Sequence, residues 1–136
     1  MSLVSVLVVD DDGSVRRAMQ DVLGEEGYAV RLAANGRYAL EQIATHVPAL
    51  LLTDYEMPEL DGERLIERVR VHHPCLPILV ITSRAVDDAR REAARLGVID
   101  YLYKPIDLDV LLGRVSAALD GGWSSSPKAD RSAAAR

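Results

Sequence analysis

The chain has 136 residues, of which 49% are apolar and 27% charged, the usual composition of a soluble globular domain. This length supports one hydrophobic core rather than two, and no apolar run approaches the ~20 residues that cross a bilayer. The formal net charge is −5, and because residues 121–136 carry a net +2, residues 1–120 carry −7. That balance argues against binding nucleic acid through its phosphates, and it favours a cation or a basic protein as partner.

Apolar runs of strand length alternate with amphipathic stretches of helical period along the chain. The first predicted elements are a strand over 4–9, a helix from Val15 to Gly27, a strand over 28–33, a helix opened by Asn35 and a strand over 49–53. Then follow a helix over 61–72, a strand over 78–82, a helix over 86–96, a strand over 98–103 and a helix capped by Asp107. We therefore predict a single doubly wound α/β domain over residues 1–120, with five parallel strands and five helices. Residues 121–136 are small, polar and aperiodic, which predicts a disordered tail or a linker.

The third predicted strand ends in a carboxylate. Asp54 closes the apolar run 50–53, and Met57-Pro58 follow almost at once. The residue before a proline is pushed out of the α region, so the backbone must turn before Asp61 caps the next helix. The sequence thus places a carboxylate on a rigid turn at the carboxyl end of a strand, where α/β proteins carry their chemistry.

Polar residues follow three other strands of the predicted sheet. They are Asp10, Asp11 and Asp12 after the first strand, Thr82 and Ser83 at the fourth, and Lys104 after the fifth. Carboxylates gathered at one edge would repel one another, and the positive charge of a bound Mg²⁺ would relieve this repulsion. Mg²⁺ suits such a site because it prefers oxygen ligands. Such a metal is commonly shared with a phosphate, whose oxygens suit a lysine and a hydroxyl. The residues therefore predict a Mg²⁺-dependent phosphoryl-transfer site.

Four separated segments, VLVVDDD, LLTDYEMPELDG, PILVITS and DYLYKP, resemble the receiver domain of two-component response regulators. The resemblance runs from residue 3 to about 119 in the order and spacing of that family. It implies a flavodoxin-like sheet of strand order 2-1-3-4-5 and a signalling switch that phosphorylation activates. It also implies that Asp54 is the phosphoacceptor, which takes its phosphoryl group from a sensor histidine kinase or a phosphotransfer protein. Such a protein is not an enzyme beyond its self-catalysed phosphoryl transfer and slow autodephosphorylation.

The resemblance also assigns roles to further residues. The Mg²⁺ ligands would be Asp10, Asp11, Asp54 and the main-chain carbonyl of Glu56. Thr82 and Lys104 would hold the phosphoryl group, and the bond from Lys104 to Pro105 is expected to be cis. Tyr101 matches the aromatic switch residue that turns inward as Thr82 moves and alters a partner surface.

The implied partners are proteins. Besides the kinase, we expect a downstream protein or a C-terminal output domain outside this chain, and the segment DDDGSVRRAM resembles receivers that precede DNA-binding domains. We expect a cytoplasmic location, with no contact to a membrane and no direct binding of nucleic acid by this domain. A dimer that depends on phosphorylation is left open.

Two other functions are weighed against the receiver. The strand-one segment also resembles the D-x-D-G-T motif of haloacid-dehalogenase-type phosphatases, with Asp10 as nucleophile and Asp12 as general acid. That hypothesis leaves Asp54 unexplained, and we predict instead that Asp12 caps the first helix. A receiver-like binding module that works without phosphorylation is the third hypothesis, and the presence of every expected site residue disfavours it.

Overall fold

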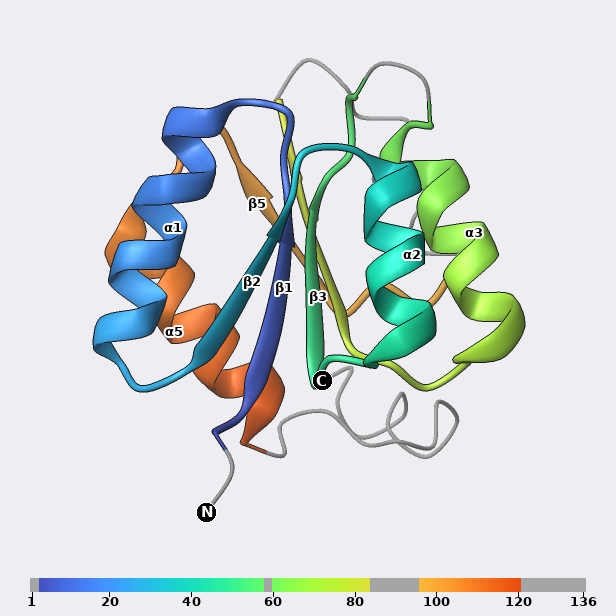
Figure 1. Ribbon diagram of the computed structural model, residues 1–136. Helices are drawn as coiled ribbons and strands as arrows, with labels where there is room; N and C mark the ends of the chain where they lie inside the picture. Colours follow the sequence, from blue (N-terminus) through green and yellow to red (C-terminus); the bar gives the residue numbers. More distant parts are fainter. Residues whose placement is uncertain (1–2, 58–59, 84–95, 121–136) are drawn as a thin grey trace.

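The computed structural model describes residues 3–57, 60–83 and 96–120, in which five parallel strands form one sheet of order β2-β1-β3-β4-β5 (Figure 1). The strands are β1 (Ser5–Val9), β2 (Ala29–Ala33), β3 (Leu50–Asp54), β4 (Ile78–Thr82) and β5 (Asp100–Tyr103). The helices are α1 (Gly13–Glu25), α2 (Gly36–Thr45), α3 (Gly62–His72) and α5 (Leu108–Leu119). The predicted fold class and strand order are confirmed. The helix predicted over 86–96 falls largely outside the described residues, as does the tail over 121–136.

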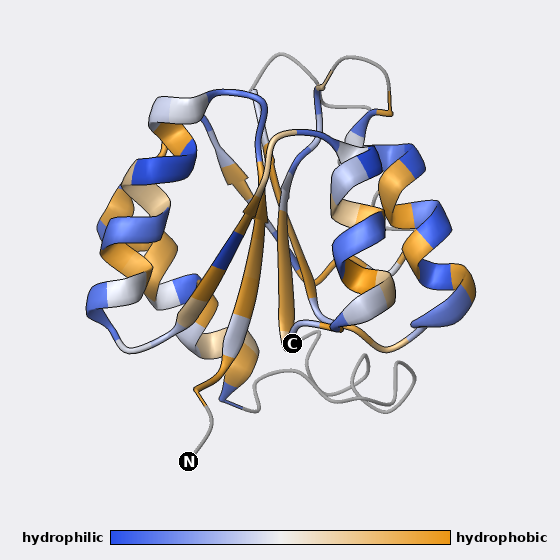
Figure 2. Ribbon diagram, in the orientation of Figure 1, coloured by the Kyte–Doolittle hydropathy of each residue, from blue (hydrophilic) through white to orange (hydrophobic). Residues whose placement is uncertain are grey.

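The helices cover both faces of the sheet, with α1 and α5 on one side and α2 and α3 on the other (Figure 1). Successive side chains of a strand point to opposite faces, so a strand covered on both sides is apolar at every position. In β1, accordingly, Val6 and Val8 belong to the apolar cluster under α1 and α5, and Leu7 and Val9 to the cluster under α2 and α3. Figure 2 shows the strands as largely hydrophobic, whereas the helices carry hydrophilic residues on parts of their surface.

Each described helix begins at a side-chain cap that the sequence predicted. The capping residues are Asp12 for α1, Asn35 for α2, Asp61 for α3 and Asp107 for α5, and each accepts hydrogen bonds from backbone N–H groups of the first turn. Such a cap contributes about 1 kcal/mol to helix stability because these N–H groups have no partner within the helix. The caps fix where each helix leaves the sheet.

The turn after β3 is closed by backbone contacts. Gly62 donates its N–H to the carbonyl of Tyr55 at 2.9 Å, and a Cβ at this position would lie 2.5 Å from the carbonyl oxygen of Asp54. Glycine is required here because only hydrogen fits between the start of α3 and the end of β3. The close approach holds Asp54 against the first turn of α3.

Several predicted element ends differ from the structure by one or two residues. β3 includes Asp54, one residue beyond the predicted end, because Asp54 pairs with Ile81 of β4. β5 begins at Asp100, two residues after the predicted start at Val98. Within the described residues, no helix has the length and apolar character that would let it span a membrane.

Candidate functional site

The carboxyl ends of β1, β3, β4 and β5 bring four predicted site residues together. Asp10 follows β1, Asp54 ends β3, Thr82 ends β4 and Lys104 follows β5. The Nζ of Lys104 lies 2.8 Å from Oδ2 of Asp54 and 3.9 Å from Oδ2 of Asp10. Carboxylate oxygens of Asp10, Asp11 and Asp54 all lie within 4.8 Å of one another. The predicted meeting of three carboxylates and one ammonium is thus present in the structure.

Burial raises the energy of the charges at this edge. Asp10, Asp54 and Thr82 are fully buried, whereas Asp11 is exposed. Burial raises the pKa of Asp10 and of Asp54 above the ordinary value, and the hydrogen bond or charge of Lys104 offsets only part of this effect. Burial works to lower the pKa of Lys104, but its hydrogen bond to Asp54 and the neighbouring carboxylates leave that pKa raised. The site therefore carries an excess of costly negative charge.

The carboxylates fit a hard divalent cation. Oδ1 of Asp10 accepts a hydrogen bond from the N–H of Asp12 at 2.9 Å, whereas Oδ2 of Asp10 is buried and has no hydrogen-bond partner within the described residues. A buried oxygen without a hydrogen-bond partner is costly, and a bound cation would satisfy it. An oxygen-only set with two or three carboxylates is the donor set that Mg²⁺ prefers. The residues present therefore fit the predicted metal.

Asp54 is held at both of its oxygens. Oδ2 accepts from Lys104, and Oδ1 accepts from the N–H of Glu56 at 3.1 Å. These two bonds fix the carboxylate at the end of β3 and direct it toward Asp10 and Lys104. A carboxylate oriented in this way can act as a nucleophile toward an electrophile that enters from the sheet edge.

The side chain of Glu56 makes a contact that the sequence did not predict. Its carboxylate accepts hydrogen bonds from the hydroxyl of Thr82 at 3.3 Å, and from the N–H and hydroxyl of Ser83 at 3.3 and 3.4 Å. The sequence assigned a metal-ligand role to the main-chain carbonyl of Glu56, and that assignment stays a prediction. The contact joins loops 27 residues apart in the chain, so no local pattern could have revealed it.

Arg16 is a further residue that the sequence did not single out. Its Nη1 donates to the main-chain carbonyl of Asp10 at 2.6 Å, although Arg16 lies on α1. The guanidinium thus ties α1 to the end of β1, directly beside the buried carboxylate. The place of Arg16 one helical turn after the cap Asp12 is the one sequence feature that points toward this contact.

The remaining predicted residues lie on or beside β5. The peptide bond between Lys104 and Pro105 is cis, as expected, and the N–H of Lys104 donates to the carbonyl of Thr82 at 2.9 Å. Tyr101 pairs with Val80 of β4 and packs, half-buried, against the apolar cluster under α2 and α3. Its position next to the strand that carries Thr82 suits the predicted switch, and that role stays a prediction.

The geometry of Asp12 disfavours the phosphatase hypothesis. Its carboxylate accepts from the hydroxyl and N–H of Ser14 and from the N–H of Val15. These hydrogen bonds lower the pKa of Asp12, because they stabilise the charged form. A carboxyl group that is held ionised as a helix cap is poorly suited to act as a general acid.

Comparison with known proteins gives a consistent result. Residues 6–116 match the family model described as response regulator receiver domain. The chain is 40% identical over 116 residues to the transcriptional regulatory protein ZraR of Klebsiella oxytoca, covering 85% of this chain and 26% of ZraR. It is 42% identical over 116 residues to the response regulator MprA of Mycolicibacterium vanbaalenii, covering 85% of this chain and 50% of MprA.

The fold agrees with the sequence match. The crystal structure of a putative response regulator from Chloroflexus aurantiacus superposes with a TM-score of 0.82 at 38% identity, over 88% of this chain and 99% of that one. The chain spans about a quarter of the length of ZraR and half that of MprA. Since the match covers most of the chain in sequence and in fold, the protein belongs to the receiver domain family of two-component response regulators.

Proposed function

We propose that Asp54 accepts a phosphoryl group from a phosphohistidine of a sensor histidine kinase, and that this modification switches the surface of the domain. The family to which the chain belongs is one of phosphorylation-activated signalling switches. The observation that carries the assignment is the buried carboxylate of Asp54, held 2.8 Å from Lys104 and beside two further carboxylates. Asp10 is also buried and lies 3.9 Å from Lys104, but only Asp54 among the acidic residues described at this edge is both buried and hydrogen-bonded at each of its oxygens.

The transfer needs few protein groups. Asp10, Asp11 and Asp54 would hold Mg²⁺, which when bound supplies positive charge for the phosphoryl oxygens. An oxygen of Asp54 forms the new bond to phosphorus as the bond from phosphorus to the imidazole nitrogen breaks, and the histidine leaves. Lys104 stabilises the ionised form of Asp54 against the effect of burial before the transfer, and afterwards it would bind the phosphoryl oxygens. The chain thus orients a nucleophile and balances charge, as phosphoryl transfer requires.

The switch begins at Thr82 in this proposal. Its hydroxyl donates to Glu56 in the unphosphorylated protein, and a phosphoryl group on Asp54 offers a stronger acceptor. Thr82 would exchange one acceptor for the other, and the backbone of β4 next to Tyr101 would follow. This movement is the expected origin of a changed partner surface.

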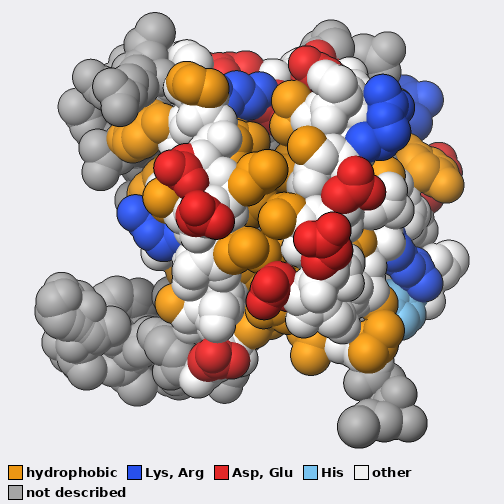
Figure 3. Space-filling view, turned by 90° about the vertical axis from the view of Figure 1, so that its left-hand side faces the viewer, with side chains coloured by type: hydrophobic (Ala, Val, Ile, Leu, Met, Phe, Trp, Pro, Cys, Tyr) orange, Lys and Arg blue, Asp and Glu red, His pale blue; other side chains and the backbone are white. Residues whose placement is uncertain are grey.

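The kinase partner is supported by a groove beside the site. A cavity of about 240 Å³ lies between α1 and the segment after β5, and its lining is mainly apolar and ends at Lys104. Figure 3 shows apolar side chains on this face, with acidic side chains around them. Such a surface would seat the apolar side of a kinase helix and present its phosphohistidine to Asp54.

The output is proposed from the relatives. ZraR is named a transcriptional regulatory protein and is about four times as long as the matched segment, so we infer an output domain that regulates transcription. Residues 1–120 would then be the receiver domain and residues 121–136 the start of a linker. The receiver domain would be located in the cytoplasm, where the kinase domain carries its phosphohistidine.

Intact-protein mass after incubation with acetyl phosphate and Mg²⁺ tests the proposal. The wild-type protein should gain one phosphoryl adduct, and the adduct should vanish when Mg²⁺ is chelated or in Asp54→Asn. Asp12→Ala is the matched control, because it removes an acidic side chain of the same edge that serves only as a helix cap. Equal loss of the adduct in both variants would refute the assignment of Asp54. Steady release of phosphate that depends on Asp10 would favour the phosphatase instead.

A further inference from the structure

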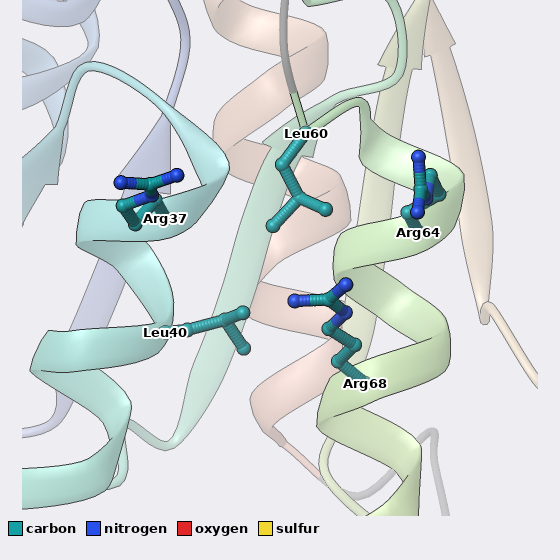
Figure 4. Close-up of a pocket in the computed structure, with 5 residues that line it drawn as sticks. All are labelled: Arg37, Leu40, Leu60, Arg64 and Arg68. Carbon is teal, nitrogen blue, oxygen red and sulfur yellow. The ribbon is translucent and has the colours of Figure 1, made fainter.

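A second cavity, lined by arginines and leucines, lies between α2 and α3, and none of the site residues lines it. Its volume is about 460 Å³, and it is lined by Arg37, Leu40, Leu60, Arg64 and Arg68. Figure 4 shows Arg37 and Leu40 on α2 and Arg68 on α3, with the side chain of Leu60 between the two helices. We call this cavity the arginine groove.

Within the part of the chain that the structure describes, ion pairs do not account for the positions of the three arginines. Arg37 is the second residue of α2, where the helix dipole opposes a positive charge, and α2 has no acidic residue in its first turn. Arg64 and Arg68 are four residues apart on α3, so their like charges share one face of the helix and repel. None of the ion pairs among the described residues involves these three side chains.

The lining of the groove identifies the kind of ligand. Guanidinium groups bind phosphate through paired hydrogen bonds, and three of them exceed what one carboxylate needs. Leu40 and Leu60, both half-buried, provide an apolar wall beside the charges. The volume lies in the range of small-molecule sites. Because the protein as a whole is negatively charged, an extended polyanion would be repelled outside the groove, whereas a compact one would not.

We propose that the arginine groove binds a small phosphorylated molecule, with its phosphates on Arg37, Arg64 and Arg68 and its apolar part against Leu40 and Leu60. Such a ligand would bring an input to the receiver other than the phosphoryl group on Asp54. The proposal does not depend on Asp54 or on Mg²⁺.

Isothermal titration with pyrophosphate and with ADP, in chelator and at constant ionic strength, tests this proposal. The variants are Arg68→Gln, the double variant Arg37→Gln/Arg68→Gln, and the matched control Arg17→Gln, which removes an exposed arginine from α1. Arg68→Gln should weaken binding by about five- to tenfold, because it removes one charged hydrogen-bond donor. The double variant should show no measurable binding, and Arg17→Gln should match the wild type. ADP should bind at least as tightly as pyrophosphate, since its adenosine would contact Leu40 and Leu60.

Equal binding of pyrophosphate by the wild type and the double variant would overturn the proposal, as would no binding to either protein. Weaker binding of ADP than of pyrophosphate would refute the role of the leucines. A peptide of alternating glutamate and leucine is the third probe. If it binds in an Arg68-dependent manner while both phosphates fail, the groove is a docking surface for an acidic protein segment and the proposal is wrong.

Discussion

Replacing Asp10 by asparagine should make the metal-free protein more stable. The side chain is fully buried, one of its oxygens has no partner within the described residues, and burial raises its pKa. Asp10→Asn keeps the shape and the oxygen that accepts from the N–H of Asp12, and it removes the buried charge. A substitution at a functional site that stabilises the fold is expected where charge has been gathered to bind a ligand.

The magnitude follows from three contributions. With an effective dielectric constant of about 20, repulsion from Asp54 within 4.8 Å amounts to about 3 kcal/mol, and attraction to Lys104 at 3.9 Å to about 4 kcal/mol. These two nearly cancel, so the cost of burying an ionised carboxylate, several kcal/mol, decides the sign. We expect the free energy of unfolding to rise by about 1–3 kcal/mol, which corresponds to about 4–10 °C in Tm.

The assay is urea and thermal unfolding at neutral pH in chelator, with Asp11→Asn as the matched control. Asp11 belongs to the same cluster but is exposed, so its replacement should change the unfolding free energy by less than about 0.5 kcal/mol. Mg²⁺ at about 100 times its Kd should stabilise the wild type by about 2.7 kcal/mol and Asp10→Asn far less. A variant that melts below the wild type in chelator would show that burial does not dominate at Asp10.

Four further outcomes follow from the same geometry. In chelator, the free energy of unfolding should fall as pH rises above about 4. The reason is that the raised pKa values of Asp10 and Asp54 make the folded state hold more protons than the unfolded state. A rise in the unfolding free energy over that window, in a pH series of unfolding curves, would contradict this. Lys104→Met should lower the unfolding free energy by about 2 kcal/mol in chelator, because it leaves the buried carboxylate of Asp54 without its partner. This loss is smaller than for a deeply buried pair because a third of the Lys104 side chain is exposed. An unchanged urea midpoint would count against the ion pair. Gly62→Ala should cost about 3 kcal/mol because the new Cβ meets the backbone of Asp54, whereas Gly24→Ala in open space should be neutral or stabilising; equal urea midpoints for the two variants would exclude the clash. Glu56→Gln should accept phosphoryl groups from acetyl phosphate a few-fold faster, because a negative charge beside the acceptor is removed, and slower labelling in a mass time course would refute this.

The sequence by itself determined the elements and the membership of the site. Apolar runs and helical periods mark the strands and helices, because parallel strands covered on both faces and amphipathic helices must bury those residues. The caps at Asp12, Asn35, Asp61 and Asp107 were predictable because capping is local chemistry between residues two or three apart. Asp10, Asp54, Thr82 and Lys104 were predictable as a group, because parallel strands end at one edge.

Only the tertiary structure decided how these groups meet. Lys104 contacts Asp54 across 50 residues of sequence, and the choice of Asp54 over Asp10 as its closer partner depends on how β5 packs against β4. The unpartnered oxygen of Asp10 and the bonds from Thr82 and Ser83 to Glu56 likewise arise between separate loops. The arginine groove forms between α2 and α3. In the sequence of either helix alone, its arginines look like ordinary exposed residues. Local patterns determine which face of an element is buried, whereas distances between side chains on different elements depend on packing across the whole core.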